Sequence, residues 1–296
     1  MMDATEARSG KGHRDENFPV ASWLVRPENR APILAFYRFV RAADDVADHP
    51  GLTADEKLAM LDQLEASLLG RGAPDPEAEP LRRALAERGL SPRHAQDLLD
   101  AFRLDARKSR YENWSELMGY CALSAMPVGR FVLDVHGETP ERVWAASDAI
   151  CAALQVNNHL QDCGKDFRDL DRVYLPLDIL AAHGAAVEEL GADRASPALR
   201  AAITEVVRKT ETLLQEGKAL PDLIQDTRLS LEIAAIHRLA EVIVAGLRRR
   251  DPLSEKVHIG KGGFAVIALA AAARTLIRRP FPRRGTAALP AGTGTR

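Results

Sequence analysis

Hydrophobic residues recur along most of this chain with the spacing of amphipathic helices. They return at intervals of three and four residues, and Ala, Leu, Arg and Glu, which favour helices, are abundant. Runs of alternating β-branched residues bounded by tight turns, which would indicate strands, are scarce. The pattern therefore predicts an all-α protein. The expected helices span residues 30–49, 54–69, 77–88, 92–107, 113–136, 140–167, 196–217, 228–249 and 262–278.

Turn and capping residues fall between the expected helices. Pro50 and Gly51 stop the first helix, and Thr139 followed by Pro140 supplies an N-cap and a first-turn proline for a later one. No Pro-, Gly- or Ser-rich linker divides the chain, and no repeat of fixed period occurs. We therefore expect one domain with a disordered tail at each end. The expected extents are 15–280 for the domain and 1–14 and 281–296 for the tails.

Composition narrows the class of protein. The formal net charge is −2, so the chain lacks the overall basic character of nucleic-acid binders. Its three cysteines show no CxxC spacing, which fits a reducing compartment. The polar N-terminus has no apolar core of a signal peptide, and the most apolar run, residues 263–273, is too short to span a bilayer. These features predict a soluble, cytoplasmic protein.

The C-terminal part is markedly basic. From Arg248 to Arg296 there are eleven Lys or Arg, against Asp251 and Glu255 as the acids. Such a segment is most often a solvated basic tail. Each cation near an anionic membrane surface is also worth about 1 kcal/mol. The sequence therefore keeps two interpretations open, a solvated tail or peripheral contact with the inner membrane.

An acidic stripe lies on the first expected helix, in the segment FYRFVRAADDVADHP. Helix positions i, i+4, i+7 and i+11 share a face, which aligns Tyr37, Arg41, Asp44 and Asp48. Asp44 and Asp48 are like charges one turn apart, which destabilises a bare helix by about 0.2–0.5 kcal/mol. A cation bound between them would reverse the sign of that effect.

A second stripe lies in the segment QVNNHLQDCGKDF. Gln155, Asn158, Asp162 and Asp166 share one helix face at i, i+3, i+7 and i+11. Carboxylate and amide oxygens are the ligands that Mg²⁺ prefers, together with water and substrate phosphates. Zinc is disfavoured, because the histidines never occur at HxxxH spacing and His159 lies off the stripe.

A single DxxxD on a helix is usually a solvated face. Here the helices are apolar on their other sides, as Ala43 and Val46 show for the first and Ala152 and Val156 for the second. A mainly apolar helix is a buried helix, and buried carboxylates need partners or a metal. Two such helices in one chain therefore indicate a divalent-metal site to which both contribute.

These segments resemble the squalene and phytoene synthase family of head-to-head prenyl transferases, from about Glu16 to about Arg279. The resemblance rests on the DxxxD of the first stripe, on YCALSAMPVGR and on QVNNHLQDCGKDFRDLDRVYLP. ENFPVAS at 16–22 and SAMPVGR at 124–130 are similar to the bacterial branch that makes hydroxysqualene. One departure is Asp171, where many relatives have glycine, so the geometry of that turn is open.

The resemblance implies an isoprenoid synthase helical bundle around a central cavity. It implies Mg²⁺-dependent ionisation of presqualene diphosphate and capture by water, which gives hydroxysqualene and diphosphate. Two or three Mg²⁺ ions would bind with the isoprenoid diphosphate. NADPH is not expected, and the chain has no GxGxxG motif. Other enzymes of the squalene pathway are expected partners.

The resemblance also assigns roles to residues of the two stripes and the segments that follow them. Arg41 and Arg172 would pair with diphosphate oxygens, because guanidinium groups suit phosphate geometry, although a surface salt bridge would also explain either. The expected metal ligands are Asp44, Asp48, Asn158 and Asp162, and Asp166 would bind metal either directly or through water.

Aromatic faces near the stripes would stabilise a carbocation. For Phe36 and Phe131, plain packing in the core is the better explanation, whereas for Tyr37 and Tyr120 the two explanations are even, because a buried tyrosine hydroxyl needs a partner. Pro127 and the small residues around Gly129 are expected to kink the helix and make room for a C30 chain. The aromatic candidates are Phe36, Tyr37, Tyr120, Phe131 and Tyr174. The candidates that position substrate or water are Asn17, Tyr120 and Gln155.

The sequence leaves two other enzyme activities and one non-catalytic role open. A presqualene diphosphate synthase would condense two farnesyl diphosphates with the same metal stripes, and a phytoene-synthase-like enzyme would differ in pocket depth. A non-catalytic helical scaffold would have lost metal carboxylates, yet both stripes are intact. Nucleic-acid binding is disfavoured, because the aspartates would repel phosphate without metal.

Overall fold

The computed structural model describes residues 25–278, so both expected tails lie outside the described part. Within that part there is no strand, and Arg110 and Val173 form the one isolated β-bridge. The all-α prediction is confirmed, whereas the single domain over 15–280 stays a prediction. The helices are α1 (Pro27–Ala47), α2 (Ala54–Leu68), α3 (Ala78–Arg88), α4 (Arg93–Asp105), α5 (Trp114–Ser124), α6 (Met126–Val135), α7 (Pro140–Leu170), α8 (Leu177–Ala182), η1 (Val187–Gly191), α9 (Pro197–Gly217), α10 (Leu220–Leu223), α11 (Thr227–Arg249) and α12 (Lys261–Arg278).

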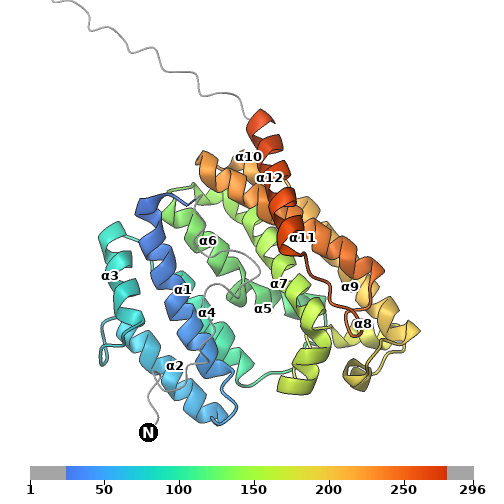
Figure 1. Cartoon of the computed structure of the whole chain (residues 1–296). Helices are drawn as coiled ribbons and strands as arrows, with labels where there is room; N and C mark the ends of the chain where they lie inside the picture. The colour runs from blue at the N-terminus through green and yellow to red at the C-terminus, as the bar shows by residue number, and fades with distance from the viewer. Residues whose placement is uncertain (1–24, 279–296) are drawn as a thin grey trace, which may run out of the picture.

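The helices form two packed groups with α5, α6 and α7 between them (Figure 1). On one side α1 packs against α3 and α4, and their apolar faces make one hydrophobic cluster with α2 and part of α6. On the other side α7 packs against α9, α9 against α11, and α11 against α12. Among the described residues no helix is both long and apolar enough to cross a membrane.

The helix ends follow local chemistry that the sequence shows. Thr53 and Glu56 form a reciprocal capping box at the start of α2, and the Ser196 side chain accepts from the backbone N–H of Leu199 at the start of α9. Eight of the nine expected helices are present as single helices, with boundaries that differ by a few residues. The short elements α8, η1 and α10 were not expected, because four to six residues carry no readable helical period.

Residues 113–136 do not form the single helix that the sequence predicts. α5 and α6 meet at Ala125, whose φ of −123° and ψ of −45° interrupt the helix, and Pro127 lies in the first turn of α6. The expected kink is therefore present. Gly129 has a different role, because a Cβ there would lie 2.5 Å from Sγ of Cys151 on α7. The glycine lets α6 and α7 approach closely and does not itself make the kink.

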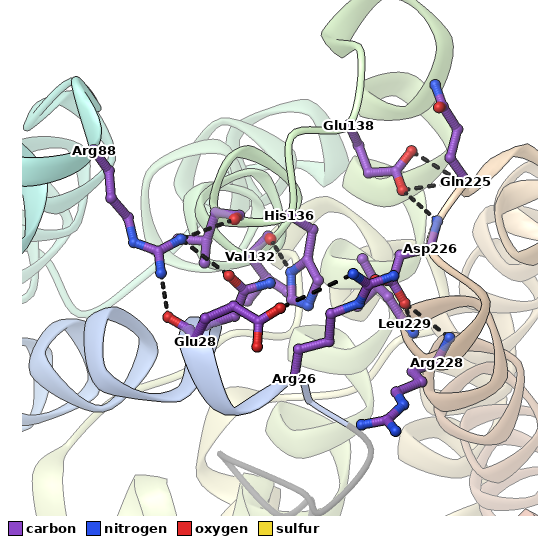
Figure 2. Close-up of polar contacts among 12 residues, drawn as sticks. Arg26, Glu28, Arg88, Val132, His136, Glu138, Gln225, Asp226, Arg228 and Leu229 are labelled. Atoms are coloured by element: carbon purple, nitrogen blue, oxygen red, sulfur yellow. Dashed lines mark hydrogen bonds and ion pairs between the residues drawn. The ribbon is translucent and has the colours of Figure 1, made fainter.

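A polar network fixes the start of α1 against the far group of helices (Figure 2). Arg26 forms an ion pair of 2.6 Å with Asp226, the N-cap residue of α11. Glu138, only 5% exposed, accepts hydrogen bonds from the backbone N–H groups of Gln225 and Asp226 at 2.9–3.0 Å. A buried carboxylate that accepts three hydrogen bonds from two donors is satisfied, so this network ties the starts of α1 and α11 to the turn before α7.

Arg88 at the end of α3 extends the same network (Figure 2). Its guanidinium donates to the carbonyl of Glu28, to Oδ1 of Asn29 at 3.0 Å and to the carbonyl of Val135 at 3.3 Å. The last of these groups lies at the end of α6, where carbonyls have no helical partner. Both ends of the network therefore anchor α1, which carries the first acidic stripe.

Candidate active site

A cavity of about 570 Å³ lies between the two groups of helices. It extends along α1 from Ile33 past Asp44, which are about 16 Å apart on a helix that rises 1.5 Å per residue. We call its two parts the aspartate end and the apolar end. The aspartate end is lined by Arg41, Asp44, Asp48, Asp105, Asn158, Asp166 and Arg172. The apolar end is lined by Ile33, Phe36, Leu98, Phe131, Val132 and Ile236.

The first acidic stripe faces the cavity as its spacing predicts. Tyr37, Arg41, Asp44 and Asp48 all line it. Arg41 forms ion pairs with Asp44 at 2.7 Å and with Asp45 at 3.0 Å. Burial, and then the charge of Asp48, raise the pKa of Asp44 to about 7, although Arg41 acts in the opposite direction. Asp44 is thus a carboxylate that lacks enough compensating positive charge.

The second stripe is only partly turned toward the cavity. Gln155, Asn158 and Asp166 line it, whereas Asp162 is exposed and is absent from the lining. Burial, and then the charge of Asp162, raise the pKa of Asp166 to about 7. The expected ranking, with Asp162 as a direct ligand and Asp166 as a direct or water-mediated one, is therefore not the ranking that the cavity lining suggests. The ligand roles of both stay predictions.

Arg172, which follows the helix that carries the second stripe, contacts the first stripe. Its guanidinium donates to Oδ1 of Asp48 at 2.7 Å, and the side chain is only 12% exposed. The preceding residue, Asp171, is the C-cap of α7 with φ 50° and ψ 38°, the left-handed region that favours glycine. Aspartate tolerates this conformation better than most residues, and Arg110 donates to both its carbonyl and its carboxylate. The turn that the sequence left open therefore forms and directs Arg172 inward.

Asp105 is a cavity residue that the sequence analysis missed. Its Oδ2 accepts a hydrogen bond of 2.9 Å from the Tyr120 hydroxyl, and its Oδ1 is buried with no partner among the described residues. Burial raises the pKa of Asp105 to about 6, against the lowering effects of Arg172 and Tyr120. One signal was available in the sequence. Asp105 is the last residue of α4, where the helix dipole disfavours a carboxylate.

His159 is a second missed residue. The sequence placed it off the acidic stripe, but it lies one turn after Gln155 and lines the same cavity. Its ring stacks on Tyr174 with a centroid distance of 3.5 Å, and its Nε2 is buried without a partner in the described part. Burial, and then the charge of Arg172, lower the pKa of His159 to about 3, so the imidazole is neutral.

All of the expected aromatic side chains lie at the cavity. Tyr120 and Tyr174 line it beside Tyr111, with ring centroids 5.2–5.7 Å apart. Phe36 and Phe131 stack on each other at 4.0 Å with an interplanar angle of 9°. The two phenylalanines are therefore both core residues and cavity wall. Aromatic faces are thus available along the apolar end and beside the aspartate end.

The donor set fits a magnesium ion that binds together with a ligand. Asp44, Asp48, Asn158 and Asp166 offer oxygen donors, and the raised pKa values of Asp44 and Asp166 mark unmet negative charge. Within residues 25–278 no three Asp, Glu, His or Cys side chains converge closely enough to hold a metal by themselves. Mg²⁺ commonly takes one or two carboxylates and completes its shell with water and phosphate oxygens. Asn17, an expected substrate-binding residue, lies outside the described residues.

Comparison with known proteins agrees with this architecture. The sequence pattern of the squalene/phytoene synthase family matches residues 12–262. Hydroxysqualene synthase of Rhodopseudomonas palustris is 57% identical over 95% of this chain and 96% of its own length, and that of Sinorhizobium fredii is 53% identical over 96% and 97%. The crystal structure of a squalene synthase from Alicyclobacillus acidocaldarius superposes with a TM-score of 0.69 at 34% identity, over 78% of this chain and 87% of that one.

Proposed function

Because the chain belongs to the squalene/phytoene synthase family, we propose that its cavity binds an isoprenoid diphosphate with the diphosphate group at the aspartate end. The isoprenoid chains would occupy the apolar end. The observation that carries this proposal is the division of one cavity into a part lined by acids and arginines and a part lined by aliphatic and aromatic side chains. An amphiphile with a charged head and an apolar body fits such a division.

The substrate is presqualene diphosphate and the product is hydroxysqualene. The carbon–oxygen bond to diphosphate breaks, and the electron pair leaves with the diphosphate. The oxygen of a water molecule then forms a bond to the rearranged carbocation and loses one proton. The hydroxysqualene synthases that share 49–57% of their residues with this chain support this choice over the C40 alternative.

The arginines prepare the diphosphate end. Arg41 is paired with Asp44, and Arg172 is paired with Asp48. A diphosphate that enters offers each guanidinium stronger anionic oxygens, so each arginine exchanges its carboxylate for the substrate. The exchange leaves Asp44 and Asp48 without their cationic partners, which increases their demand for Mg²⁺.

Asp44, Asp48, Asn158 and Asp166 would hold Mg²⁺, with Asp162 at the exposed edge of the same helix. Bound there with the diphosphate, the ions would supply Lewis-acid charge to neutralise the leaving group. The protein itself fixes the head group, and the aromatic rings of Tyr37, Tyr120 and Tyr174 offer π faces to the cation left behind.

Capture by water needs polar atoms inside the cavity. Oδ1 of Asp105 is a buried acceptor, and Nε2 of His159 is a buried ring nitrogen that accepts when the proton is on Nδ1; neither atom has a partner among the described residues, and both residues line the cavity beside Tyr120. A water held between these two groups and the Tyr120 hydroxyl is positioned to attack, and the Asp105 carboxylate can take the proton that it loses. Gln155, also in the lining, completes the polar set.

The proposed substrate and product are C30 lipids that are poorly soluble in water. The protein would therefore work at the cytoplasmic face of the inner membrane, with its basic C-terminal region in peripheral contact. An enzyme that joins two C15 diphosphates must supply the substrate, and an enzyme that replaces or removes the hydroxyl must consume the product. These enzymes are the partners that we propose.

Incubation of the purified chain with presqualene diphosphate, followed by mass analysis of the lipid extract, tests the proposal. We expect hydroxysqualene in the presence of Mg²⁺, none after chelation, and no change of product when NADPH is added. Farnesyl diphosphate alone should give no C30 product. Formation of presqualene diphosphate from farnesyl diphosphate would instead identify the preceding step, and a C40 product would identify a phytoene-synthase-like activity.

The water site has a separate readout. Tyr120→Phe, Asp105→Asn and His159→Phe should each raise the share of C30 hydrocarbons and other alcohols relative to hydroxysqualene. An unchanged product ratio in all three variants would rule out this part of the proposal.

A further inference from the structure

The outermost helix, α12, is apolar on both of its long faces. Its inner face, which includes Phe264, Ile267 and Thr275, packs along α11. Its outer face carries large apolar side chains that are 56–84% exposed. A helix that is apolar all round is normally buried. The outer face of α12 is nevertheless covered by no other part of the described chain. That outer face consists of Ala265, Val266, Leu269, Ala270, Ala273, Leu276 and Ile277.

This face holds most of the exposed large hydrophobic side chains of the described chain. Six such residues are more than a third exposed, and four of them are Val266, Leu269, Leu276 and Ile277. They recur at i, i+3, i+10 and i+11, so they point to one side of the helix. Val128 and Leu170, the other two, line the cavity. An apolar patch concentrated in this way marks an interaction surface.

The positive charge on and near α12 indicates what kind of surface its outer face would bind. No Asp or Glu occurs after Glu255, whereas eight Lys or Arg do. Arg274 and Arg278 are exposed on α12 itself, and Arg278 reaches Asp222 of α10 at 3.2 Å. An exposed apolar helix face with cations beside it and no acid on the helix is complementary to a surface that is negative outside and apolar below.

We infer that the outer face of α12 docks onto a membrane surface that carries anionic lipids. The helix of eighteen residues is about 27 Å long and would lie in the plane of the headgroups with Leu269 and Ile277 turned into the acyl boundary. α11 carries Ile236, a residue of the cavity wall, and packs directly against α12. The membrane contact is thus one helix away from the apolar end of the cavity.

Co-sedimentation with vesicles tests the inference on the full chain. Binding is measured to vesicles of phosphatidylcholine alone and of phosphatidylcholine mixed in equal parts with phosphatidylglycerol. We expect binding to the mixed vesicles at low salt, weaker binding at high salt, and little to phosphatidylcholine alone. Leu269→Glu combined with Ile277→Glu should weaken binding roughly tenfold or more, because two side chains that insert become charged.

A charge-matched control separates insertion from net charge. Ala86→Glu on α3 combined with Ala182→Glu on α8 adds the same two carboxylates at exposed helical positions, and it should weaken binding much less. Hydroxysqualene formation from detergent-dispersed substrate should be the same in both double variants and the parent. If the parent forms no hydroxysqualene, the proposed function is rejected. The vesicle-binding result then still decides whether α12 docks onto membranes.

Three results would overturn the inference. The parent chain does not sediment with mixed vesicles, or the α12 variant sediments as well as the control. In the third, light scattering shows that the parent and the control variant are dimers and that the α12 variant is a monomer, while the parent does not bind vesicles. That last result would assign the face to a second copy of the chain.

Discussion

At the aspartate end of the cavity, Asp44, Asp48, Asp105 and Asp166 gather four carboxyl groups around little positive charge, whereas at the apolar end Phe36 and its neighbours pack ring on ring. The first end is electrostatically unfavourable, because burial raises the pKa of three of its acids to about 6 or 7. The second is ordinary core. The difference indicates that stability comes from the apolar end and chemistry from the aspartate end.

The acids should matter for turnover and hardly for folding. Asp44→Asn and Asp48→Asn, made separately, are each expected to lower hydroxysqualene formation by about a hundredfold to a thousandfold, because a charged group that binds Mg²⁺ and diphosphate is lost. Burial disfavours the charged form of Asp44, and Asn has no charge, so the melting temperature of Asp44→Asn should not fall. Asp100→Asn, an exposed carboxyl on α4, is the control. Activity within tenfold of the parent in both variants would contradict the assignment of this end.

The apolar end should show the opposite balance. Phe36 is 4% exposed and stacks on Phe131, so Phe36→Ala should lower the free energy of unfolding by about 3–5 kcal/mol, as measured in urea. Phe36→Leu keeps most of the volume and should cost less than about 1.5 kcal/mol. Equal losses for the two substitutions would mean that the ring does not pack as described.

The free energy of unfolding, measured as a function of pH, tests the raised pKa of Asp105. Between pH 3.8 and about 6 the folded chain holds a proton on Asp105 that the unfolded chain has released. The free energy of unfolding therefore falls as the pH rises through this window, by about 2–3 kcal/mol from this group. The difference in stability between the parent and Asp105→Asn should change by that amount from pH 4 to pH 7. A difference independent of pH would show that Asp105 is not perturbed.

The smallest effect is expected at the turn that directs Arg172. Asp171→Gly relieves a left-handed conformation but loses the contact with Arg110 and adds freedom to the unfolded chain, so stability should change by less than about 1 kcal/mol. Asp171→Val, a β-branched residue at the same φ, should cost about 1–3 kcal/mol. Thermal unfolding of the pair measures both, and similar melting temperatures would contradict the left-handed turn.

Much of the fold could be predicted from local patterns. The helical period located all nine long helical segments, and the spacing of Tyr37, Arg41, Asp44 and Asp48 placed four side chains on one face that does line the cavity. The helical period joined α5 and α6 into one kinked helix, because the full break at Ala125 depends on φ and ψ values that its residue type does not dictate. The spacing also grouped Asp162 with the side chains that face the cavity, although Asp162 is exposed and does not line it, because helical spacing alone does not show where along its length a helix leaves the cavity wall.

The sequence by itself determined the all-α class, the two acidic stripes and the family, since each depends on spacing within one segment or on a segment matched as a whole. Only the tertiary structure decided that Asp105 and His159 belong to the cavity and that α12 keeps an uncovered apolar face. The physical reason is distance along the chain. Burial and unpaired polar atoms arise where helices far apart in sequence meet, and no local pattern records which faces remain outside.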